Sequence, residues 1–163
     1  MSTNPETAAL VRYLNAQREH VLSAVDGLTA SEMRQATLPS GWHIVGLLNH
    51  LTIGVEHYWF RCIINGGSLA ELPDGDWVVS DEVTATEAID RYRESTVLSN
   101  AILTTATLDA PPRQRDPGWA GLDHAFRDVR DIALHVLAET ACHAGQLDAA
   151  RELLDGHQWL VIP

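Results

Sequence analysis

The sequence has 163 residues, a length typical of one domain, and its 45% apolar and 20% charged residues are enough to build a hydrophobic core. The net charge is −11 and all eleven basic residues are arginine, so neither a nucleic acid nor an anionic membrane is expected as a partner. No apolar run has the length of a membrane span, and the N-terminus MSTNPETAAL lacks the pattern of a signal peptide. Two distant cysteines, Cys62 and Cys142, favour a reduced, cytoplasmic protein.

Helical periodicity begins near the N-terminus. The first expected helix covers residues 5–27, because Asn4 is a good N-cap and Pro5 suits a first helical turn. A short helix over 30–35 follows, with Thr29 as its cap. The apolar stripe of the long helix consists of Leu10, Leu14, Val21, Val25 and Leu28.

A second long helix is expected from the segment LPSGWHIVGLLNHL to about Ile64. Ser40 is its expected cap, and Gly66–Gly67 ends it. The following stretch, 66–83, is rich in Gly, Asp and Pro and is expected to form a loop.

The second half of the chain predicts two more helices. Thr84 and Glu87 fit a capping box, so a third long helix is expected to run to about Thr107. The loop LDAPPRQRDPGWAGLD follows and is long for a plain connector, which is typical of functional loops. The fourth helix is expected from about Phe126 to Leu154, before Gly156, with apolar positions that include Val129, Ile132, Leu134, Val136, Leu137 and Leu147. The pattern predicts an all-α, antiparallel four-helix bundle.

Candidate metal ligands lie on one face of the fourth helix. His135, Glu139 and His143 follow one another at intervals of four residues. The two histidines are about 12 Å apart along the helix axis, so one adjacent pair binds and a third ligand must come from another helix. The second long helix offers His43, His50 and His57. Ordinary polar pairs on a helix surface produce the same spacing. The residues are therefore interpreted either as metal ligands or as such a surface pair.

Two segments carry a family resemblance. PSGWHIVGLLNHLTIGVEHYWF and ALHVLAETACHAGQLDAARELLDG resemble the DinB/YfiT-like superfamily, and more narrowly its mycothiol-dependent S-transferase-like subgroup. The resemblance implies that residues 1–163 form a single DinB-like helical bundle holding a divalent metal with three ligands. Carried onto this chain, those ligands are His50, Glu139 and His143, and His135 is a neighbour.

The resemblance implies a metal-dependent S-transferase. It would activate a low-molecular-weight thiol, with mycothiol as the favoured candidate, for conjugation to a small electrophile in detoxification. Zinc is the favoured metal, with nickel and iron as alternatives. A second hypothesis is a metal-dependent hydrolase on the same site, with Glu56, Asp148 or His135 as the base. A third is a non-enzymatic metal-binding module in stress or interaction.

Several other residues are candidates for secondary roles. Trp77 and Trp119 lie in loops, where an aromatic side chain marks either a pocket rim or an interface. The C-terminal WLVIP and an apolar bundle face favour a homodimer. Three arginines in or near the loops could hold polar groups of a substrate: Arg61, Arg113 and Arg115.

Overall fold

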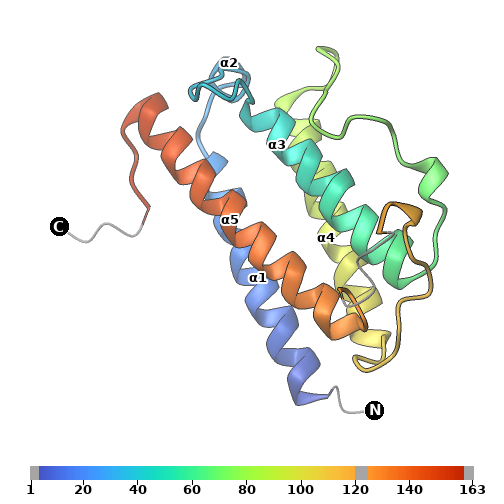
Figure 1. Ribbon diagram of the computed structural model, residues 1–163. Coiled ribbons are helices and arrows are strands. Elements are labelled where there is room, and N and C mark those ends of the chain that lie inside the picture. The colour runs from blue at the N-terminus through green and yellow to red at the C-terminus, as the bar shows by residue number, and fades with distance from the viewer. Residues whose placement is uncertain (1–3, 120–124, 160–163) are drawn as a thin grey trace.

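The computed structural model describes residues 4–119 and 125–159 as a bundle of helices (Figure 1). Its main helices are α1 (Pro5–Val25), α2 (Ala30–Met33), α3 (Ile44–His50), η1 (Leu51–Ile64), α4 (Ala85–Thr105) and α5 (Val129–Asp155). Two single 3₁₀ turns, η2 (Leu69–Glu71) and η3 (Pro117–Trp119), lie in the long loops. No strand occurs in this part of the chain, so the predicted all-α fold is confirmed. The last residues of the loop LDAPPRQRDPGWAGLD and the end of the C-terminal WLVIP segment lie outside the described residues.

The predicted helix caps explain where most helices begin and end. Asn4 Oδ1 accepts a hydrogen bond from Glu6 N at 2.9 Å. Thr29 and Thr84 each form a complete capping box with the glutamate three residues later. Gly156 ends α5 with φ +78°, which suits a residue without a Cβ.

The cap of the second long helix is His43 and not Ser40. Residues 38–41 form a turn in which Gly41 N donates to Leu38 O at 2.9 Å, so the helix cannot start there. His43 Nδ1 instead accepts a hydrogen bond from Gly46 N at 3.0 Å. This helix also changes character after His50, because η1 is a π-helix whose hydrogen bonds span five residues.

The fourth long helix begins later than its sequence suggests. Asp128 caps it by accepting from Asp131 N at 2.9 Å, whereas Phe126 has a positive φ of 52° that no helix allows. Leu134 was expected in the core but is 49% exposed. The remaining predicted apolar positions of α5 face the bundle interior in full or in part.

The bundle contains both parallel and antiparallel neighbouring helices (Figure 1). α1 and α5 run in the same direction: Arg130 pairs with Glu6 at their beginnings, and Arg151 Nη1 donates to Ala24 O at their ends. α3–η1 and α4 also run in one direction, opposite to α1 and α5. The predicted antiparallel order therefore holds between these two pairs of helices and not within them. Residues 66–83 return along the bundle, as a long crossover must between parallel neighbours.

The hydrophobic core is built by all the long helices. Its fully buried side chains include Leu14, Leu51, Phe60, Ile132 and Leu147. Each such side chain contributes about 1.5–3 kcal/mol on burial, which holds the helices in register. Within the two described ranges, no helix is long and apolar enough to cross a membrane.

Candidate metal centre

His50 occupies the junction of α3 and η1 and is held from two sides. Its Nδ1 lies 2.7 Å from Asp76 Oδ2, and the indole of Trp77 stacks on the ring at 4.3 Å between centroids. The imidazole side chain is only 12% exposed. A buried imidazole in an apolar stretch of helix needs a polar partner, and Asp76 is that partner.

Glu139 and His143 lie one turn apart on α5 and face His50. Glu139 Oε1 is 3.8 Å from His50 Nε2. His143 Nδ1 lies 2.9 Å from Gln146 Oε1, which leaves its Nε2 free. One ligand atom from each of the three residues lies within 4.8 Å of the others. The structure thus brings His50, Glu139 and His143 together across two helices.

Two atoms of this cluster are buried without a hydrogen-bond partner, His50 Nε2 and Glu139 Oε2. Such atoms are rare in proteins, because each forfeits its interaction with water. A cation between an imidazole nitrogen and a carboxylate oxygen satisfies both. Two imidazoles and one carboxylate are ligands that zinc accepts, so the donor set fits a divalent metal.

The surroundings set the charge of each group. His135, and after it His50, lowers the pKa of Glu139 from 4.5 to about 2, so this carboxylate is ionised at neutral pH. Burial lowers the pKa of His143, and the nearby His50 adds to the effect, which favours the neutral form that binds metals. Burial also disfavours charge on His50, but Glu139 and Asp76 outweigh it and raise its pKa.

Aromatic rings line both flanks of the cluster. Trp77 covers His50 on one flank. On the other, Trp59 stacks on Trp119 at 5.4 Å, and His135 meets the edge of Trp59 at 4.7 Å. His135 Nε2 is also 3.0 Å from Glu139 Oε2, an ion-pair contact whose orientation is not that of a hydrogen bond. Both loop tryptophans thus lie at this site and contact its histidines directly or through one ring.

Two of the three proposed hydrolytic bases are committed elsewhere. Glu56 is 1% exposed and forms a bidentate pair with Arg18 at 2.8 and 2.7 Å. Asp148 lies 2.8 Å from His20 Nε2. The structure thus pairs both carboxylates with side chains outside the three-residue cluster and does not bring either of them to it. His135 alone among the three contacts the cluster.

The other predicted residues lie apart from the three ligands. His43 caps α3, and His57 faces a hollow between η1 and α4. Arg61 pairs with the exposed Glu71, while Arg115 lies over the ring of Trp119. The C-terminal segment contributes Trp159, which stacks on His20 at 4.2 Å. Its role in a homodimer stays a prediction.

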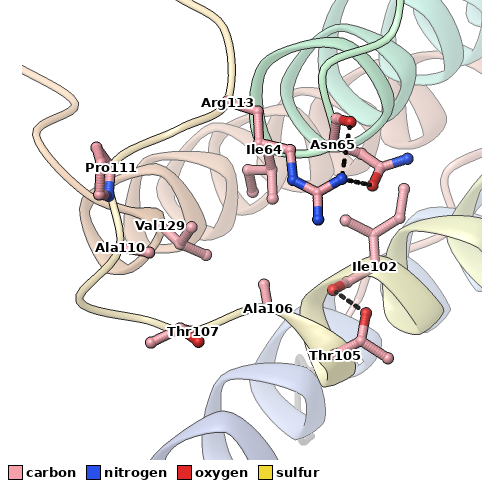
Figure 2. Close-up of a pocket in the computed structure, with 10 residues that line it drawn as sticks. All are labelled: Ile64, Asn65, Ile102, Thr105, Ala106, Thr107, Ala110, Pro111, Arg113 and Val129. Carbon is pink, nitrogen blue, oxygen red and sulfur yellow. Dashed lines mark hydrogen bonds between the residues drawn. The ribbon is translucent and has the colours of Figure 1, made fainter.

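A separate cavity of about 200 Å³ lies where η1 and α4 end (Figure 2). Arg113 reaches over it and donates to the backbone and side-chain oxygens of Asn65. Apolar side chains such as Ile64, Ile102 and Val129 line it together with polar residues such as Thr105. No residue of the metal-ligand cluster lines this cavity, so the two features are distinct.

Asp76 and Gln146 are the members of the site that sequence reasoning missed. Asp76 lies in the crossover loop, 26 residues from His50, where no spacing rule links it to the helix. Gln146 could have been found, because it follows His143 at the i, i+3 interval that places side chains together on a helix.

The helical bundle carries a two-histidine, one-glutamate cluster between two of its helices, and this donor set fits a divalent metal. A family model described as mycothiol-S-transferase matches residues 9–156, which is most of the chain. The chain therefore belongs to this family, and the resemblance drawn from the two sequence segments is confirmed. No curated protein and no solved structure matches it.

Proposed function

We propose that this protein is a metal-dependent transferase that joins the sulfur of mycothiol to a small electrophile, with zinc held by His50, Glu139 and His143. The observation that carries the proposal is the three-residue cluster with its unpartnered buried atoms His50 Nε2 and Glu139 Oε2. Membership of the mycothiol-S-transferase family supports the choice of thiol.

The chain's own residues prepare the site for a thiol. His50, Glu139 and His143 would hold a divalent metal with a coordination position left for the sulfur, and the metal's charge would favour a thiolate at neutral pH. Asp76 and Gln146 orient the two imidazoles by binding their Nδ1 atoms. The ionised Glu139 supplies one negative charge, and a bound thiolate would supply the second that a divalent cation needs.

The reaction forms one carbon–sulfur bond and releases one proton. The electrophile loses its leaving group with the bonding electron pair, and the thiol proton goes to a base. His135 is the side chain suited to carry it, because it lies 3.0 Å from Glu139 and is 38% exposed to solvent. The tryptophans on both flanks limit water around the sulfur.

Product analysis tests this proposal. Zinc-loaded protein, mycothiol and an aryl halide should yield a thioether faster than mycothiol and zinc alone. His143→Ala should abolish the acceleration, while Asp74→Asn, a change to an exposed carboxylate, should retain it. Cleavage of an ester or amide without thioether formation would favour the hydrolase. Zinc binding without any acceleration across a panel of electrophiles would favour a non-enzymatic module.

A further inference from the structure

The crossover loop makes a tight turn against α3 and η1. Val78 N donates to Gly75 O at 3.0 Å, and Gly75 has φ +73°, a conformation that side chains disfavour. The two central residues of the turn both meet His50. Asp76 binds its Nδ1 at 2.7 Å, and Trp77 stacks on its ring.

Two helical glycines make room for this turn. A Cβ on Gly54 would overlap Asp76 Oδ2 and approach His50 Nδ1 to 3.0 Å, and a Cβ on Gly46 would lie 3.1 Å from Trp77 O. Between them, Asn49 Nδ2 donates to Asp76 O at 2.6 Å. Glycine within a helix is less stable than alanine, so these positions give up helix stability where the loop needs space.

We propose that the turn 75–78 is a positioning element of the metal centre, in which Asp76, admitted by Gly54, fixes the imidazole of His50. The inference rests on the proposed function. A carboxylate that accepts a hydrogen bond from Nδ1–H keeps the ring proton on Nδ1 and leaves the Nε2 lone pair free. Nε2 is the atom that faces Glu139. Trp77 blocks rotation of the ring out of this orientation.

Zinc affinity measures the contribution of the turn. Competition with a chromophoric chelator gives the dissociation constant for the whole protein and its variants. Asp76→Ala and Gly54→Ala should each weaken zinc binding about 10–100-fold, the usual loss for a group behind a ligating histidine. Asp76→Asn retains an acceptor oxygen and should lose less. The double variant Gly54→Ala/Asp76→Ala should add little to either single change, because both act on one hydrogen bond.

The tautomer of His50 in the metal-free protein is a readout that a purely structural role would not move. ¹⁵N NMR should show His50 protonated at Nδ1 at a pH where the ring is neutral. In Asp76→Ala and Gly54→Ala, Nε2–H should become populated. This measurement needs no metal and no activity, so it tests the inference even if the proposed function fails.

Two matched variants separate this effect from general damage. Asp74→Asn changes an exposed carboxylate of the same loop, and Gly145→Ala adds a Cβ to a helical glycine with open space around it. Both should retain the wild-type affinity and tautomer. The inference is overturned if the Asp76 and Gly54 variants keep the wild-type tautomer and zinc affinity. Absence of zinc binding by the wild type would overturn the proposed function instead.

Discussion

Glu56 of η1 and Glu139 of α5 are carboxylates with opposite surroundings inside one bundle. Both oxygens of Glu56 accept hydrogen bonds from Arg18, whose remaining nitrogen binds Asn15 and Asn100. Glu139 has no arginine: its Oε2 contacts His135 Nε2 at 3.0 Å without forming a hydrogen bond, and its Oε1 lies 3.8 Å from His50 Nε2. The first cluster is complete without a ligand, whereas the second leaves His50 Nε2 buried without a hydrogen-bond partner, facing Glu139, where a divalent cation would contact both. Hydrogen-bond completeness therefore separates a structural polar cluster from a candidate binding site.

The largest expected effect comes from breaking the complete cluster. Arg18→Met should lower the free energy of unfolding by about 3–5 kcal/mol, because it leaves Glu56 buried and unpaired. Urea titration of the metal-free protein measures this loss. The double variant Arg18→Met/Glu56→Leu should recover most of it, since an apolar pair needs no counter-charge. A cost below about 1 kcal/mol in the single variant would show that Glu56 is not isolated from water.

The incomplete cluster should respond in metal binding. Glu139→Gln and His143→Ala should each weaken zinc binding by about 100-fold or more, since a lost ligand costs at least as much as a lost supporting group. That factor corresponds to about 2.7 kcal/mol of binding free energy. Chelation of zinc should lower the melting temperature of the wild type and leave that of Glu139→Gln unchanged. Equal shifts in both proteins would contradict the assignment of Glu139 as a ligand.

The sequence predicted those features that depend on neighbours along the chain. Capping residues such as Thr84 located helix starts, and the four-residue interval located Glu139 and His143 on one face. The choice of His50 came from the family resemblance, because spacing alone left three histidines open. Asp76 escaped prediction, since its approach depends on how the crossover loop folds back. The π-helical hydrogen bonding of η1 also has no signature in apolar periodicity.

Acid should reveal the depressed pKa of Glu139 in the metal-free protein. Because His135 and His50 lower this pKa to about 2, the ionised carboxylate stabilises the fold above its ordinary pKa of 4.5. This contribution, on the order of 2 kcal/mol, should disappear as the pH falls from 4.5 towards 2. Over this pH range, the free energy of unfolding should fall more steeply with decreasing pH in the wild type than in Glu139→Gln. Parallel curves would mean that Glu139 titrates normally.

An exposed ion pair provides the smallest expected effect and a scale for the others. Arg93 lies 3.3 Å from Asp90 on the surface of α4, where water screens both charges. Arg93→Ala should change the free energy of unfolding by less than about 1 kcal/mol and leave zinc affinity unaltered. Denaturant titration and chelator competition on the same preparation check both. A loss near that of Arg18→Met would remove burial as the explanation for the larger effect.

Zinc content provides the most direct test of the metal centre. Wild type and Glu139→Gln are saturated with zinc, desalted in parallel and analysed by elemental mass spectrometry, with circular dichroism to establish that both are folded. The metal centre proposed from His50, Glu139 and His143 predicts about one zinc per wild-type chain and almost none in the variant. Equal zinc in the two proteins, or none in the wild type, would contradict it.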